Sequence, residues 1–148
     1  MMNDNRNKNG SNYPKGGGNY NNRPYTQQQP ISLPNIELDY IKDPELFNET
    51  AKKTASAISG TKSTQIRNFY DYIMDLEEKA QNGELFSEIL PFVRMLNSKA
   101  NYARERRVAS AEFTQMLSKC VSQISTPKQL TTFKLFFEAV IGFSKKNK

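Results

Sequence analysis

The segment SKANYARERR, residues 98–107, combines basic side chains with an aromatic one and a single acid. Its candidate binding residues are Lys99, Tyr102, Arg104, Arg106 and Arg107. Arginine and lysine donate hydrogen bonds to phosphate and sugar, and tyrosine stacks on a base or a ribose. The segment is therefore typical of contact with nucleic acid. The alternative is a solvated helix face, because cations in a last turn stabilise a helix and long basic side chains often flank a core.

These residues fall on two sides of one apolar stripe if the segment is helical. Arg94 and Arg104 lie along one border of the stripe, and the other side carries Lys99, Tyr102 and Arg106. Both sides offer groups that suit a phosphate backbone. We therefore include all of them in the candidate nucleic-acid-binding set.

The turn GTKSTQ adds two candidates upstream. Lys62 and the backbone amides of a helix that starts here can hold a phosphate, and Arg67 follows within two turns. Alternatively, Arg67 pairs with Asp71, which would stabilise the helix by only about 0.2–0.5 kcal/mol. The interpretation of Lys52 and Lys53 is also open, because they could belong to the same basic surface or be ordinary solvated lysines.

Three carboxylates, Asp71, Asp75 and Glu78, share one helix face and could bind a divalent cation, although such faces are usually solvated. The chain has no histidine and one cysteine, Cys120. Serine–histidine and cysteine–histidine nucleophiles are thereby excluded, and so is a zinc site built by this chain. We expect no catalytic residue, no metal and no cofactor.

The composition supports an anionic partner. The 148 residues suit one domain, and 21 basic against 15 acidic residues give a net charge of +6. No apolar run is long enough for a membrane span, and the polar amino terminus shows no signal peptide. A single cysteine, which we expect in the core, fits a reducing cytoplasm.

Helices must position the candidate residues. Apolar residues recur at helical spacing from Asp43 onward, and we predict an all-α, compact bundle of about five helices in a domain of residues 35–148. The expected helices span 43–59, 62–83, 84–107, 110–124 and from 126 onward.

Local signals mark the ends of these helices. Asp43 is the expected first N-cap, and Ser63 or Thr64 the second. Gly60 and Gly83 can end the helices that precede them. Thr126, Pro127 and Gln129 form an expected capping box, and Pro91 predicts a kink or break near Leu90.

Residues 1–34 are rich in Asn, Gly and Gln and almost lack aliphatic side chains, so we predict a disordered tail. Its basic and tyrosine residues could hold single-stranded nucleic acid, but a solubilising tail without a partner is the preferred interpretation. In the connector that follows, Ile36, Leu38 and Ile41 are expected to dock on the bundle.

Three segments resemble the small helical subunit of type III-A CRISPR effector complexes, the second member of the Csm set. They are TKSTQIRNFYDYI at 61–73, KANYARER at 99–106 and FKLFFEAVIGFSK at 133–145. The resemblance covers about residues 43–148. It matches Arg67, Lys99, Tyr102, Arg104, Phe137, Glu138 and Ala139 to the family pattern.

The resemblance implies a non-catalytic, RNA-binding subunit in the cytoplasm. Copies would stack head to tail as a minor filament beside the larger subunits that hold the guide RNA. The expected partners are guide RNA and target RNA, other Csm subunits and further copies of the chain. Two alternatives remain open: a protein–protein adaptor without RNA binding, and the equivalent small subunit of another CRISPR effector type.

Overall fold

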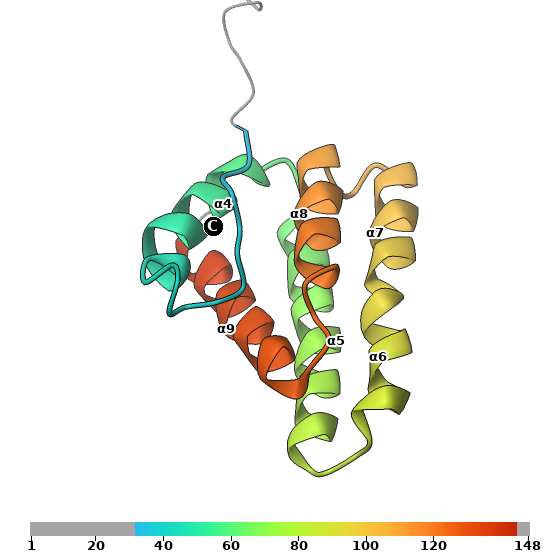
Figure 1. The fold of residues 1–148 in the computed structure, drawn as a ribbon. Coiled ribbons are helices and arrows are strands. Elements are labelled where there is room, and N and C mark those ends of the chain that lie inside the picture. The colour runs from blue at the N-terminus through green and yellow to red at the C-terminus, as the bar shows by residue number, and fades with distance from the viewer. Residues whose placement is uncertain (1–31, 145–148) are drawn as a thin grey trace, which may run out of the picture. The chain divides into compact units, whose positions relative to one another are not determined.

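Residues 32–144 are described by a computed structural model, in which they form helices and no β-strand (Figure 1). In chain order these are the π-helix η2 (Leu46–Thr50) and the α-helices α4 (Ala51–Ala57), α5 (Ser63–Gln81), α6 (Phe86–Arg94), α7 (Leu96–Glu105), α8 (Ala111–Val121) and α9 (Pro127–Phe143). η2 runs directly into α4, and only Met95 separates α6 from α7. The described chain thus contains five helical segments, and the predicted all-α bundle is confirmed.

The predicted disordered tail lies outside the described residues, apart from residues 32–34. The connector after it is tied to the bundle through hydrogen bonds between its backbone and the side chain of Gln123. Gln123 accepts from the Leu38 N–H at 2.7 Å and donates to the Ile36 carbonyl at 2.8 Å. Ile36 and Leu38 are buried as expected, whereas the expectation for Ile41 is wrong, because this side chain is 77% exposed.

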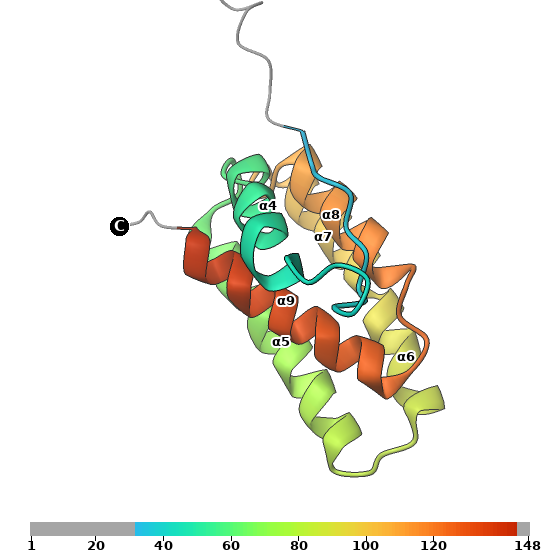
Figure 2. The same cartoon turned by 60° about the vertical axis from the view of Figure 1, so that its left-hand side comes forward.

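Helices α5, α6–α7 and α8 run side by side with alternating direction, as Figure 1 shows. Their connections are short, so consecutive helices are antiparallel neighbours. α9 runs at a slant to them and packs against both α5 and α4, and the view in Figure 2 shows it passing in front of α5. α7 packs against α8, and α6 packs against α5.

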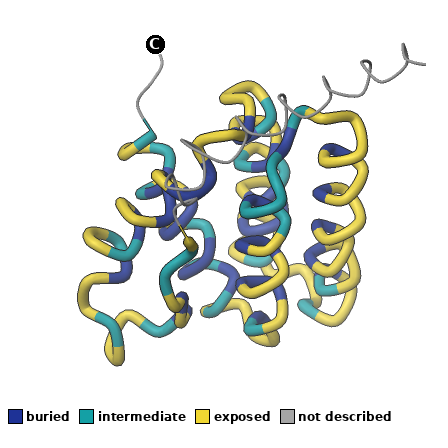
Figure 3. The backbone as a smooth tube through the Cα atoms, turned by 90° about the horizontal axis from the view of Figure 1, so that it is seen from above, coloured by how far each residue is buried: buried dark blue, intermediate teal, exposed yellow. Residues whose placement is uncertain are grey.

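The core consists of the inward sides of these helices, which Figure 3 marks as buried. Aromatic rings from three helices meet there. Phe69 of α5 and Phe113 of α8 lie edge to face, with centroids 5.0 Å apart, and Phe113 and Phe137 of α9 lie 6.5 Å apart. Such offset contacts hold aromatic pairs together beyond simple burial. They fix the spacing between α5, α8 and α9.

Several predicted helix ends are confirmed. The Thr126 hydroxyl accepts from the Gln129 N–H at 3.2 Å, and the reciprocal bond completes the capping box of α9. The predicted N-cap role of Asp43 is wrong, because Glu45 is the N-cap of η2 and the Asp43 carboxylate accepts from the Glu45 N–H at 3.0 Å. Gly83 follows α5 in the left-handed region, with φ 89°. These side-chain and backbone contacts satisfy groups that a helix end leaves open.

Three further details of the predicted ends are wrong. α5 begins at Ser63 with Lys62 as its N-cap, because the Lys62 N–H is held by the Val108 carbonyl at 3.1 Å. α4 ends at Ala57, ahead of Gly60. The interruption in the third segment falls at Met95 and not near Leu90. Pro91 lies inside α6 and has no N–H to donate to the carbonyl of Ser87, four residues earlier. Ser87 is exposed, so water can bind this carbonyl instead.

Candidate nucleic-acid interface

A groove between α5 and α7 brings together three of the predicted site residues. Lys99 and Tyr102 of α7 line it, together with Arg106, the C-cap residue directly after this helix. The groove has a volume of about 250 Å³, and α5 lines it with Gln65, Asn68 and Tyr72. Its wall therefore offers cations, amides and aromatic rings within one small space.

The helix period explains why these α7 residues share a face. They stand at positions i, i+3 and i+7, which lie on one side of an α-helix. The buried side of the same helix carries Leu96, Ala100 and Ala103, which are at most 2% exposed. α7 packs against α8, and Ala103 forms part of the groove wall between the polar side chains.

Two cation–ring contacts hold the basic side chains in place. The Lys99 ammonium lies 4.7 Å from the centroid of the Tyr72 ring, and the Arg106 guanidinium lies 5.5 Å from that of Tyr102. The Tyr72 hydroxyl donates to the Phe92 carbonyl at 2.8 Å, and burial together with Asp75 raises the pKa of Tyr72 above its ordinary value. Tyr72 is thus a fixed support, whereas Tyr102 is 65% exposed.

Lys62 and Arg107 lie at the same end of the bundle as the basic part of the groove. The two connections that carry them are tied together, since the Lys62 N–H donates to the Val108 carbonyl at 3.1 Å. The Ser110 N–H donates to the Thr61 hydroxyl at 3.0 Å, and the Ser110 hydroxyl also caps α8. Charges from the start of α5 and the end of α7 are thereby brought to one end of the molecule's helical part.

The remaining predicted residues lie elsewhere. Arg67 lines a separate hollow with Ile141 and Ser144, on the side of α5 that faces α9. Arg104 is exposed on α7 but does not line the groove. Arg94 donates from its guanidinium to the Val121 carbonyl and so joins α6 to α8. The predicted set therefore divides into the groove residues, their neighbours at the end of the bundle, and three residues on other faces.

The sequence reasoning missed the α5 wall of the groove. Gln65, Asn68 and Tyr72 repeat the i, i+3, i+7 spacing of the α7 residues. That repeat was available in the sequence as a signal of a second polar and aromatic face. It carries no basic residue, so a search for positive charge passes over it.

The predicted cations of the site stay outside ion pairs within residues 32–144. The ion pairs in this part of the chain join Lys79 to Asp75 at 3.5 Å and Lys134 to Glu138 at 3.7 Å. An exposed cation without a carboxylate partner keeps its charge available to an anion in solution. The basic surface is therefore not neutralised by neighbouring acids in the described chain.

The acidic residues of α5 do not gather into a metal site. Asp75 pairs with Lys79, and the part of the chain that the structure describes contains no group of three or more Asp, Glu, Cys or His side chains close enough to hold an ion. Cys120 is fully buried in the core, as expected from its place in the α8 stripe, and burial raises the pKa of its thiol far above the ordinary range. It has no access to a substrate.

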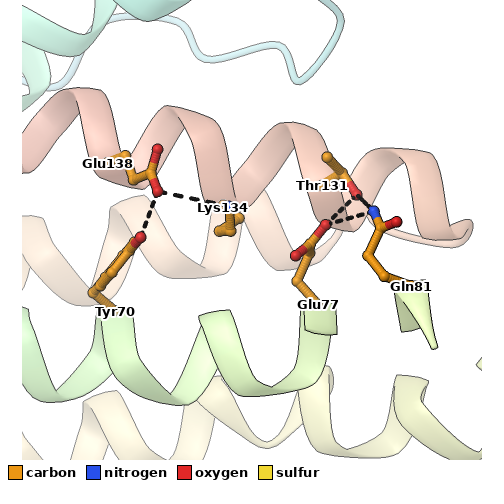
Figure 4. Close-up of polar contacts among 6 residues, drawn as sticks. All are labelled: Tyr70, Glu77, Gln81, Thr131, Lys134 and Glu138. Carbon is orange, nitrogen blue, oxygen red and sulfur yellow. Dashed lines mark hydrogen bonds and ion pairs between the residues drawn. The ribbon is translucent and has the colours of Figure 1, made fainter. Parts of the chain in front are cut away.

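Other polar groups join α5 to α9, as Figure 4 shows. Glu77 is buried, and it accepts hydrogen bonds from Gln81 at 2.8 Å and from Thr131 at 2.9 Å. Further along, the Tyr70 hydroxyl donates to Glu138. This bond, with burial and the Glu138 charge, raises the pKa of Tyr70 to about 12. These groups serve the packing of two helices.

The comparison with protein families concerns the same helical part of the chain. The model of the family described as Csm2 Type III-A matches residues 41–148. The chain belongs to the Csm2 family of type III-A. Csm2 is the small subunit of the type III-A Csm effector complex. The predicted resemblance is therefore confirmed, and type III-A is the CRISPR effector type that the family model indicates. Neither a curated protein nor a solved structure matches the chain.

Family membership assigns this Csm2 chain to a multi-subunit complex. It is a structural subunit of a CRISPR complex, and its partners include the other Csm proteins. Among the described helices, none combines the length and the apolar character needed to cross a bilayer.

Proposed function

We propose that the chain is a non-catalytic, RNA-binding subunit of the type III-A complex that contacts the backbone of the guide–target RNA duplex. The observation that carries this proposal is the convergence of Lys99, Arg106 and Tyr102 in the α5–α7 groove, outside the ion pairs of the described chain. Lys62 and Arg107 extend the positive charge around the end of the bundle. Arg67, Arg94 and Arg104 belong to the predicted set but support the proposal less, because they face elsewhere.

Backbone contact suits a subunit that must accept any target. In RNA-guided complexes, base pairing with the guide reads the sequence, while the protein holds the duplex through its backbone. Lysine and arginine neutralise phosphates without regard to sequence, and this binding weakens steeply as salt rises. The groove offers such cations on α7 and at its C-cap, where the rings of Tyr72 and Tyr102 position them.

Stacking of copies into a minor filament also belongs to this proposal. It would need surfaces of each copy that are covered in the complex. Large apolar side chains are exposed on α6 and its flanks, notably Leu85 at 64%, Phe92 at 48% and Met95 at 42%. Contacts with the next copy or with another Csm subunit would remove this surface from water. We expect the assembled particle to work in the cytoplasm, where guide and target RNA meet.

The experiment reverses charge in the groove of the assembled complex. The variant Lys99→Glu/Arg106→Glu is coexpressed with the other Csm subunits, and copurified proteins and guide RNA are identified by mass spectrometry and gel. Retention of labelled target RNA is then measured. We expect intact assembly with at least roughly tenfold weaker retention, because each lost charge-assisted hydrogen bond contributes about 1.5–3 kcal/mol.

The matched control is Lys52→Glu/Lys53→Glu, which makes the same change in net charge on the exposed side of α4. α4 and α7 lie on opposite sides of the helical part in Figure 1. The control should retain target RNA like the unmodified complex. Unchanged retention by the groove variant in an intact complex would reject the RNA contact. Equal losses of retention in both variants would show that net charge, and not the groove, determines RNA binding.

A further inference from the structure

We propose that the α5–α7 groove holds one unpaired nucleotide, with its base stacked on Tyr102 and its phosphate between Lys99 and Arg106. This inference rests on the proposed function and adds to it a ligand class. A backbone track accepts paired and unpaired RNA alike. The groove would instead select a nucleotide whose base is free to leave the stack.

The size of the groove suits a single base. Its volume of about 250 Å³ is below the range of roughly 300–1,000 Å³ that is usual for pockets that enclose drug-sized ligands. A flat heterocycle fits such a space, and the phosphate of the same nucleotide can remain at the rim. The presence of two tyrosines among the lining residues makes the wall a surface for stacking rather than a purely polar channel.

Tyr102 presents the ring that a base would contact. It is 65% exposed although it stands next to the core stripe of α7, so its ring is not used to fill the interior. Arg106 lies over it at 5.5 Å from the centroid, and the flat guanidinium extends the stacking surface while its charge attracts the phosphate. Contact with phosphate alone would not need this exposed aromatic ring.

The α5 wall supplies groups that fit the rest of a nucleotide. Asn68 and Gln65 carry amides that donate and accept hydrogen bonds, which suits the edge of a base or a ribose hydroxyl. Lys99 is held over Tyr72, and Tyr72 is fixed by its bond to the Phe92 carbonyl. The cation is therefore positioned before any ligand arrives, which lowers the entropy lost on binding.

Duplex RNA cannot place a base in this groove. In A-form RNA the bases are stacked and paired, and proteins stack aromatic side chains on bases in loops, bulges and single strands. The groove would thus engage RNA at a point where a base is displaced from the guide–target duplex or beyond its end. It would hold such a point whatever the base, since every base has a stacking face.

The test uses the full purified chain and two fluorescent probes of equal length and charge. One is a short oligouridylate, and the other is the same ribose–phosphate chain without bases. Fluorescence anisotropy gives both affinities. We expect the oligouridylate to bind about tenfold more tightly, as expected for stacking of one base on an aromatic ring. Tyr102→Leu should remove this preference, and Tyr102→Phe should keep it.

The matched control is Tyr40→Leu. Tyr40 is also an exposed tyrosine with a cation over its ring, Lys128 at 5.6 Å, but it lies in a hollow between the connector and α9. Its replacement should leave both affinities unchanged. Equal binding of the two probes by the unmodified chain, or a preference that survives Tyr102→Leu, would overturn the inference and leave the backbone contact standing. Binding to neither probe would count against the proposed function as well.

Discussion

Arg107 has a backbone conformation that is uncommon for a residue with a side chain. Its φ is 64°, in the left-handed region, directly after the end of α7. The Arg107 N–H donates to the Arg104 carbonyl at 2.9 Å, and the Val108 N–H donates to the Ala103 carbonyl at 3.0 Å. This pair of bonds is the Schellman motif, whose left-handed position is usually glycine. An arginine there adds charge to the basic end of the bundle and gives up helix-end stability.

Arg107→Gly is therefore expected to act in opposite directions on stability and on binding. The free energy of unfolding should rise by about 0.5–1 kcal/mol, because glycine adopts this conformation without the strain of a side chain. Affinity for RNA should fall, since one cation is lost. Urea denaturation and RNA anisotropy on the same preparation measure the two effects. A variant that is both less stable and equally able to bind RNA would show that the arginine serves the helix end.

Residue types alone did not distinguish basic residues that line the groove from basic residues that join two helices. Lys99 and Arg106 enter the groove, whereas Arg94 donates to a carbonyl of another helix. All three are basic residues near the same apolar stripe, and the sequence spacing places each at its border. Which neighbour meets that border depends on how α6, α7 and α8 pack. That contact joins residues far apart in the chain, so local patterns do not report it.

At the scale of whole elements, α5 and α9 are joined by a tyrosine–carboxylate contact. The Tyr70 hydroxyl donates to Glu138, and Lys134 lies 3.7 Å from the same carboxylate (Figure 4). The bond to Glu138 raises the pKa of Tyr70 from 10.0 to about 12. The folded state thus favours the protonated phenol of Tyr70. The contribution of this group to the free energy of unfolding therefore depends on pH.

The contact between these helices should weaken in alkaline solution. As pH rises from 10 toward 12, the unfolded chain releases the Tyr70 proton before the folded chain does, so the stabilisation present below pH 10 is lost across that interval. Denaturation of the unmodified chain and of Tyr70→Phe at several pH values measures this. The difference in unfolding free energy between them should shrink as pH rises. A constant difference would contradict the assigned bond.

Helix positions were largely predictable because amphipathic stripes and caps are local. The Thr126–Gln129 capping box and the buried α8 stripe follow from a few neighbouring residues. The start of α5 could not be predicted from local patterns, because the hydrogen bond from Lys62 to Val108 joins two connections that are distant in sequence. The position of α7 across the groove from α5 also depends on residues that are distant in sequence. It arises only when the hairpin of α5 and α6–α7 has formed.

At the scale of the whole helical unit, four of the predicted cations share one region, while other basic residues such as Arg67 and Arg94 lie on other faces. Lys62, Lys99, Arg106 and Arg107 lie on or near the α5–α7 groove, while Asp71, Asp75 and Glu78 follow further along α5. The net charge of +6 predicted an anionic partner, but it carried no information on where the charge would lie. The fold supplies that information. The groove brings together only Lys99, Tyr102 and Arg106 of the predicted set.

If this groove grips the RNA backbone within the complex, the salt dependence of target-RNA binding reports that contact most directly. Affinity is measured over a series of salt concentrations for the complex with unmodified subunit, with Lys99→Gln/Arg106→Gln, and with Lys52→Gln/Lys53→Gln. Each phosphate contact contributes about 0.7–0.9 to the slope of log affinity against log salt. The groove variant should show a slope that is smaller by about 1.5, and the α4 variant should match the unmodified complex. A groove variant with an unchanged slope would contradict the account.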